Sequence, residues 1–384
     1  MLTQLLLKKI QNQLLGQLTP NAFMKQHWQK KPRWISGAYP DQWEWLTPKR
    51  IKTLATHPNA QVRLIQKTPK KWKVSYGPLR PIDFKTLPQK NWTILIQDLQ
   101  HWYPEADELL RLFRFIPYAR TDDLMVSYAV PGGSVGPHYD SYDVFLLQGF
   151  GQRHWEIAQH YDKTLQNNSE IKLISPFLPE QSRTLNPGDM LYLPPHWAHH
   201  GVAVTECLTC SIGFRAPSYQ EWGDVFLNHL MDRLTLSGDY TDPELSATNN
   251  PACLPSSLTK KVHEKILELL WDQADVIECI GLTLSEPKPH VIFTPPPKPL
   301  SLNGFQKSLQ HKKLALHPAS QMLYSGAYLF WNGEAHLLPA SHLALPKILA
   351  NNRQLEPCLI EEPTLSWLFE GYLAGWCTIK PFYP

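Results

Sequence analysis

The apolar and polar positions between Trp92 and Arg215 predict a series of short strands separated by turns. Two turn sequences punctuate the series, Pro131-Gly132-Gly133 and Asn186-Pro187-Gly188-Asp189, because proline fixes φ and glycine accepts a positive φ. Strands at this spacing favour a β-barrel or a sandwich. The predicted strands include Leu124–Val130, Val144–Gln148, His154–Ile157, Met190–Leu193 and Cys207–Phe214, and another is expected to begin near His199.

The pattern becomes helical after Pro217. One set of apolar residues recurs at helical spacing in Trp222, Val225, Phe226, Leu230 and Leu234, and a second set does so in Val262, Ile266, Leu269, Leu270 and Ile277, before Gly281. The proline-rich run Glu286–Pro299 cannot continue a helix and predicts a stiff linker. We therefore expect three parts, at 1–217, 218–290 and 300–384.

Length and composition narrow the class of protein. The 384 residues exceed what one hydrophobic core usually serves, which agrees with several domains. The sequence has no apolar run of the length that a membrane span needs. The six cysteines are too sparse for a disulfide framework, which fits a reducing compartment. We expect a cytoplasmic protein without a membrane segment.

Charge is distributed unevenly along the chain. Residues 1–80 contain fifteen Lys or Arg and two acids, whereas the whole chain has a net charge of only +3. A basic segment of this kind suits nucleic acid or an acidic partner, although solvated surface is the commoner explanation. A weak contact with ribosomal RNA is therefore a side hypothesis.

Two histidine motifs and one aspartate indicate a metal centre. His138 and Asp140 are two residues apart and share a face if Gly136–Asp140 is a strand. A Pro-Pro-x-Trp-x-His motif follows after the turn at residues 186–189. The pattern His-x-Asp alone is common by chance, but this combination is not. Two imidazoles and one carboxylate suit Fe(II), with open positions left for a cosubstrate and oxygen.

Three histidines are available as the second imidazole ligand. His196 lies in the proline turn, and His200 should face away from its neighbour His199. His199 opens the next predicted strand, so we choose His138, Asp140 and His199 as the metal ligands.

Five stretches of the sequence carry a family resemblance: Trp28–Pro32, Asp122–Met125, Val130–Gly133, Gly136–Phe145 and Ser211–Pro217. They resemble the bacterial JmjC-type ribosomal oxygenases. The resemblance implies an α+β chain with a double-stranded β-helix (a cupin or JmjC barrel), a helical dimerisation segment and a C-terminal winged-helix domain. It is specific as far as residue 217 and weak afterwards.

The resemblance also implies roles for single residues. The family's metal ligands fall on His138, Asp140 and His199, and its 2-oxoglutarate arginine falls on Arg153. A planar guanidinium suits the distal carboxylate of 2-oxoglutarate, through a bidentate pair. Ser127, on a strand that leads into the site, is a candidate for an added hydroxyl hydrogen bond. Fe(II) is then the cofactor, and 2-oxoglutarate and O2 are the cosubstrates.

Acidic and aromatic residues beside the metal motif are candidates for substrate binding. Asp123 and Asp143 suit a cationic substrate by charge, and Tyr142 suits the lining of a cleft. Solvated turn residues are the alternative explanation for the two acids. We predict no catalytic side chain beyond the metal centre.

The lead hypothesis is a homodimeric hydroxylase of an arginine in a large-subunit ribosomal protein. A ribosomal histidine hydroxylase and an N-methyl-lysine demethylase are alternatives on the same scaffold. A cupin scaffold without enzymatic activity is the third. The choice of arginine depends on the family resemblance alone.

Overall fold

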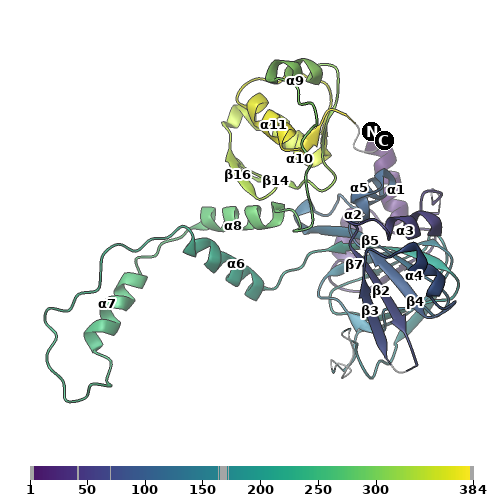
Figure 1. Cartoon of the computed structure of the whole chain (residues 1–384), viewed down its shortest axis with the longest axis horizontal. Coiled ribbons are helices and arrows are strands. Elements are labelled where there is room, and N and C mark those ends of the chain that lie inside the picture. The colour runs from purple at the N-terminus through teal and green to yellow at the C-terminus, as the bar shows by residue number, and fades with distance from the viewer. Residues whose placement is uncertain are drawn as a thin grey trace. The chain divides into compact units, whose positions relative to one another are not determined.

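The computed structural model describes residues 4–40, 43–69, 71–162, 164, 171 and 173–380 (Figure 1). The chain divides into two compact units. The first contains the residues up to Ala216 together with His290–Ile292, and the second contains Pro217–Pro289 and Phe293–Lys380. The division into three parts stays a prediction. None of the described helices has the length and apolar character needed to cross a membrane.

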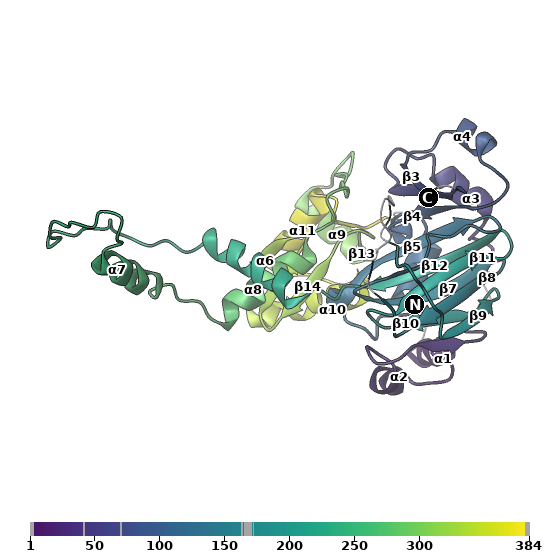
Figure 2. The same cartoon turned by 90° about the horizontal axis from the view of Figure 1, so that it is seen from below.

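An eight-stranded sheet forms the larger layer of the first unit, and Figure 2 shows its strands lying side by side. Every strand pair in it is antiparallel. Four strands predicted from sequence are confirmed in this sheet, two of them at the predicted bounds, and the fifth, at His154–Ile157, is confirmed in the smaller sheet. In spatial order the strands are β1 Arg33–Ile35, β10 Met190–Leu193, β7 Asp143–Phe150, β12 Cys207–Phe214, β5 Thr121–Ala129, β4 Trp92–Ile96, β2 Val62–Lys67 and β3 Trp72–Tyr76.

A second sheet of four antiparallel strands packs against the first. One apolar cluster joins the two layers, with Leu146 and Leu191 from the larger sheet and Trp155 and Ile157 from the smaller one. In spatial order the strands of the smaller sheet are β6 His138–Tyr139, β11 Ala198–Ala203, β8 Arg153–Ala158 and β9 Gln181–Leu185.

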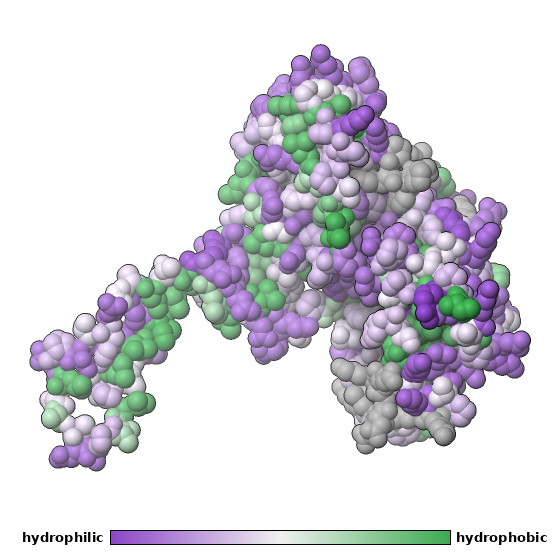
Figure 3. Space-filling view, in the orientation of Figure 1, coloured by the Kyte–Doolittle hydropathy of each residue, from purple (hydrophilic) through white to green (hydrophobic). Residues whose placement is uncertain are grey.

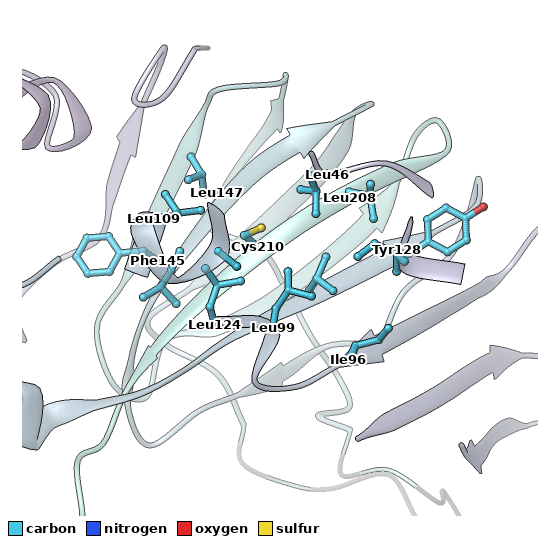
Figure 4. Packing of buried hydrophobic residues seen from close by; sticks show 14 of the residues in the cluster. Leu46, Ile96, Leu99, Leu109, Leu124, Tyr128, Phe145, Leu147, Leu208 and Cys210 are labelled. Carbon is cyan, nitrogen blue, oxygen red and sulfur yellow. The ribbon is translucent and has the colours of Figure 1, made fainter. Parts of the chain in front are cut away.

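Alternation along the central strands separates the core from the interior of the sandwich. On β5, Leu124 and Tyr128 belong to the main core beneath the helices, whereas Met125 and Ser127 line an internal cavity. Figure 4 shows Leu124, Tyr128, Phe145 and Cys210 packed with Leu46, Leu99 and Leu109. Odd and even positions of one strand thus serve different purposes.

Helices before and between these strands contribute to that core. Thr19 and Thr47 cap two of them, since each side chain accepts a hydrogen bond from a backbone N–H, and each is followed by a proline. The helices of the first unit are α1 Gln4–Leu14, α2 Pro20–Gln26, α3 Pro48–Leu54, α4 Pro81–Thr86, η1 Leu99–His101, α5 Pro104–Arg111 and η2 Tyr118–Arg120.

The second unit has its own core around Trp331, whose indole N–H donates to Ser320 Oγ at 2.7 Å. Its two three-stranded sheets run β17-β13-β18 and β14-β15-β16. The helices are α6 Tyr219–Met231, α7 Ser256–Ile266, α8 Gln273–Ser285, α9 Leu302–Leu309, η3 Ala340–His342, α10 Ala344–Asn352 and α11 Thr364–Leu373. The strands are β13 Leu314–Leu316, β14 Met322–Ser325, β15 Tyr328–Trp331, β16 Glu334–Leu337, β17 Gln354–Leu355 and β18 Cys377–Thr378.

The second helical pattern differs from its prediction. Two helices, α7 and α8, replace one continuous set, because Asp272 accepts hydrogen bonds from the N–H groups of Ala274 and Asp275 and starts a new helix. Gly281 lies inside α8, where a Cβ atom would come within 2.3 Å of the Phe330 ring. This glycine permits close packing and does not end the helix.

Candidate active site

A cavity of about 420 Å³ lies inside the first unit. Strands of both sheets line it through alternate positions, such as Ser127 on β5, Arg153 on β8 and His199 on β11. The predicted metal ligands and the predicted 2-oxoglutarate residues therefore face one space.

The three predicted metal ligands come together at this cavity. Strand register places His199 directly opposite His138, and their ring centroids lie 4.2 Å apart. Asp140 follows β6, with its Oδ2 at 3.7 Å from His199 Nε2. One ligand atom from each residue lies within 4.8 Å of the other two. This donor set is the two-histidine, one-carboxylate set of non-haem Fe(II) oxygenases.

Backbone carbonyls orient both imidazoles. His138 Nδ1 lies 2.9 Å from the Gly136 carbonyl, and His199 Nδ1 lies 3.0 Å from the Trp197 carbonyl. An Nδ1–H that donates to these oxygens leaves each Nε2 lone pair for a metal. Burial, followed by the charge of His138, lowers the pKa of His199 to about 4. This ring is therefore neutral at neutral pH, as a ligand must be.

The other two histidines lie apart from the cluster. His196 has a φ of +63° in the turn before β11, and its backbone N–H donates to the Asp140 carbonyl at 2.7 Å. His200 points to the opposite face of β11, where its Nδ1 lies 3.1 Å from Glu156 Oε2. Of the three candidate histidines, the structure thus places only His199 in the metal cluster.

Arg153 provides a buried positive charge on the cavity wall. Its side chain is almost inaccessible to solvent, and its Nη2 donates to Ser127 Oγ at 2.8 Å. Within the described ranges no carboxylate forms an ion pair with it, and its buried Nε makes no hydrogen bond. A buried guanidinium without an anion is costly. The site therefore fits the distal carboxylate of 2-oxoglutarate.

Asp123 and Tyr142 line the cavity, together with Asp122, and their contact with a substrate stays a prediction. Asp123 is buried, and its Oδ2 accepts the Asp98 backbone N–H at 3.1 Å. Burial, then the charges of Asp140, Asp123 and Asp122, raise the pKa of Tyr142. Its hydroxyl therefore remains protonated, beside the carboxylate of Asp140.

Asp143 does not line the cavity. Its carboxylate is fully buried on the other face of β7, where Tyr192 Oη donates to it at 2.6 Å and Gln29 Nε2 at 2.9 Å. Arg120 Nη2 lies 3.5 Å away. This geometry gives Asp143 a structural role in place of the predicted substrate contact. The alternation of side chains along a strand could have predicted this position, because Val144 faces the cavity and its neighbour Asp143 must then face the other way.

Sequence reasoning missed the residues that extend the cavity beyond the metal motifs. Arg63 on β2, Tyr76 on β3 and Gln97 after β4 line the cavity, from a part of the chain where no motif stands. Only the pairing of β2 with β3 and β4 brings these residues to the site.

Comparison with known proteins agrees with this geometry. The JmjC domain family matches residues 108–222, and the ROXA-like winged helix family matches residues 268–378. The ribosomal protein uL16 3-hydroxylase of Escherichia coli is 31% identical over 92% of this chain and 99% of its own length. A probable ribosomal oxygenase of Haemophilus influenzae is 39% identical over 60% of this chain, which spans 55% of that relative.

Solved structures extend the similarity to three dimensions. Escherichia coli ycfD superposes with a TM-score of 0.84 at 29% identity, covering 94% of this chain and 98% of that one. The same ribosomal oxygenase in complex with cobalt and 2-oxoglutarate gives a TM-score of 0.81 at 29% identity, covering 95% and 99%. The chain described here therefore belongs to the JmjC ribosomal oxygenases, the family of the Escherichia coli uL16 3-hydroxylase, and is a 2-oxoglutarate-dependent dioxygenase.

Proposed function

We propose that this chain hydroxylates an arginine side chain of a large-subunit ribosomal protein, with Fe(II) as cofactor. Its relative of matching length is a hydroxylase of ribosomal protein uL16, so uL16 is the proposed substrate. The observation that carries the proposal is one cavity lined both by the His138, Asp140 and His199 cluster and by buried Arg153. A ribosomal substrate implies a cytoplasmic enzyme.

His138, Asp140 and His199 would hold the iron through two Nε2 atoms and one carboxylate oxygen. When bound, iron and 2-oxoglutarate supply the oxidising power: 2-oxoglutarate and O2 become succinate and CO2, with one oxygen atom entering succinate and the other a substrate C–H bond. The Gly136 and Trp197 carbonyls hold the imidazoles in position before the metal arrives.

Arg153 and Ser127 hold the distal carboxylate of 2-oxoglutarate. The guanidinium provides charge and two parallel donors, and the Ser127 hydroxyl orients it through their 2.8 Å hydrogen bond. Because both side chains are buried, water competes weakly for the carboxylate.

Asp123 and Tyr142 favour a cationic substrate in the same cavity. With Asp122 they place two carboxylates and a protonated phenol on its wall. A guanidinium satisfies these acceptors better than a neutral imidazole, which favours arginine over histidine. A cupin scaffold without enzymatic activity has no function for the buried charge of Arg153, which argues against that alternative.

The test combines turnover with product mass. Purified chain, Fe(II), 2-oxoglutarate and uL16 are incubated with and without O2, and succinate and the mass of uL16 are recorded. The expected result is O2-dependent succinate and one added oxygen atom on uL16, both absent in His138→Ala. The control His160→Ala changes an exposed histidine that does not belong to the cluster and should remain active. Oxygen on a histidine, or release of formaldehyde with loss of a methyl group, would favour one of the alternatives.

The segment 218–290 is the proposed dimer contact. Apolar side chains lie on its surface (Figure 3), among them Leu267, Leu270 and Trp271, which are 64%, 79% and 57% exposed. A second copy of this chain that covers them would bury this area. Light scattering should report a dimer for the native chain and a monomer for Leu267→Glu with Leu270→Glu. Leu359→Glu, at an exposed leucine outside the segment, should remain dimeric.

The hairpin of β2 and β3 is the proposed contact for ribosomal RNA. Lys67, Lys71 and Lys73 are exposed on it, and its residues Val74 and Tyr76 line the cavity. The logarithm of the affinity for ribosomal RNA should fall linearly with the logarithm of the salt concentration, and each phosphate contact should make that slope steeper.

Replacing Lys71 and Lys73 by Gln should flatten that salt dependence. The control replaces Lys8 and Lys9, which are exposed on α1, and should leave it unchanged. Binding that is insensitive to salt would exclude the contact.

A further inference from the structure

A second group of metal-ligating side chains lies in the first unit, apart from the proposed iron site. Asp98, His101 and His290 each offer one ligand atom, and these atoms lie within 4.8 Å of one another. All three residues belong to the first unit, although His290 comes nearly two hundred positions later in the sequence than Asp98. The fold therefore assembles this group, and no local motif predicts it.

Asp98 places a buried carboxylate at the centre of this group. It follows β4 with a φ of +53°, and its side chain is only 3% exposed. Gln100 Nε2 donates to Asp98 Oδ1 at 3.3 Å, while Oδ2 lies 3.0 Å from His290 Nε2. One carboxylate oxygen is thus held by an amide and the other faces an imidazole.

His101 joins the group through the tight turn of η1. Its backbone N–H donates to the Asp98 carbonyl at 2.9 Å, which brings the two side chains onto the same side of the turn. The imidazole is only partly buried, so a cation can reach it from solvent.

His290 provides the observation that favours a ligand. Its buried Nε2 lies at ion-pair distance from Asp98 Oδ2, yet within the described residues it makes no hydrogen bond. A buried imidazole nitrogen without a hydrogen bond is costly, and coordination of a cation would use its lone pair. The prolines Pro287 and Pro289 stiffen the chain that delivers it.

We propose that Asp98, His101 and His290 bind a divalent transition metal such as Zn²⁺. Two imidazoles and one carboxylate are ligands that Zn²⁺ accepts, with water in the fourth position, whereas Mg²⁺ and Ca²⁺ prefer oxygen alone. The metal fastens the segment His290–Ile292 to η1. It also steadies Asp98, whose backbone N–H orients the cavity residue Asp123.

Metal binding tests the site independently of hydroxylase activity. The untagged full chain with His138→Ala and His199→Ala, which lacks two proposed iron ligands, is stripped with a chelator and dialysed against Zn²⁺. We expect one bound Zn²⁺ per chain, and none after His290→Ala or His101→Ala is added. Co²⁺ should give a visible absorption band with the same dependence. His160→Ala in the same background should keep its metal.

Unfolding temperature provides a second readout. Zn²⁺ should raise the unfolding temperature of the variant with His138→Ala and His199→Ala. It should leave that temperature unchanged once His290→Ala is added. If the His290→Ala variant does not fold, His290→Gln takes its place. A folded background protein that binds no Zn²⁺ would reduce the group to an ion pair between Asp98 and His290 and overturn the proposal. Zn²⁺ binding that survives His290→Ala would do the same.

Discussion

Two parts of the cavity wall are built differently. His138, His199 and Arg153 lie on paired strands of the smaller sheet, and backbone carbonyls or Ser127 orient them. Tyr142, in contrast, is 38% exposed, and Tyr76, on the edge hairpin, is 76% exposed. The oxidation chemistry therefore depends on rigid strand register, whereas substrate choice depends on side chains that can change without disturbing the sheets.

The largest effect should follow from removing the buried charge of Arg153. Arg153→Met should raise the KM for 2-oxoglutarate by about a hundredfold, because charge-assisted hydrogen bonds contribute about 1.5–3 kcal/mol. The KM for uL16 should stay the same. Titration of 2-oxoglutarate with succinate as the readout measures this, and an unchanged KM would remove Arg153 from the cosubstrate site.

A substitution at Asp143 distinguishes a structural role of this residue from a role in substrate binding. Asp143→Asn should lower the free energy of unfolding by about 2 kcal/mol, because an amide cannot accept from both Tyr192 and Gln29 without presenting an N–H group to one of them. Urea unfolding measures the loss. Native stability with a weakened KM for uL16 would instead restore the substrate contact predicted from sequence.

Asp123→Asn should act on the substrate alone. The amide oxygen can still accept the Asp98 N–H, so the fold is kept, while the loss of one charge should raise the KM for uL16 by about tenfold. The KM for 2-oxoglutarate serves as the internal control. A change in both constants would mean that substrate binding and cosubstrate binding are coupled.

The smallest effect belongs to the exposed hairpin. Tyr76→Ala should raise the KM for uL16 only about threefold, since most contacts at the rim of a binding surface contribute less than about 1 kcal/mol. Leu178→Ala, at an exposed leucine outside the cavity lining, should have no effect on the same assay. An effect of Tyr76→Ala as large as that of Asp123→Asn would make the hairpin a major part of substrate recognition.

Short-range patterns explain which features were predictable from sequence. The strands Met190–Leu193 and Cys207–Phe214 have the predicted bounds because turn residues flank the first and β-prone residues fill the second. His199 could be separated from His200 because neighbouring strand residues face opposite ways. Asp143 was predicted to bind the substrate because it lies close to the metal motif in the sequence. The same alternation rule places its side chain on the strand face opposite to that of Val144.

Long-range pairing explains what the sequence could not show. Arg63 and Tyr76 reach the cavity only because β2 lies between β3 and β4 in the larger sheet. His290 reaches Asp98 through a proline-rich run that predicts only stiffness. The break between α7 and α8 depends on the N-cap at Asp272. The sequence pattern missed this break because the apolar residues on either side of it continue at helical spacing.

Isotope labelling shows whether the oxygen atom added to uL16 comes from O2 and which residue receives it. uL16 is incubated with the enzyme, Fe(II) and 2-oxoglutarate under dioxygen made of the heavy oxygen isotope, and the modified residue is located by tandem mass spectrometry. We expect one heavy oxygen atom on an arginine carbon, and none with His138→Ala. Ordinary oxygen at that position, modification of another residue type, or modification that persists in His138→Ala would contradict the proposed arginine hydroxylation.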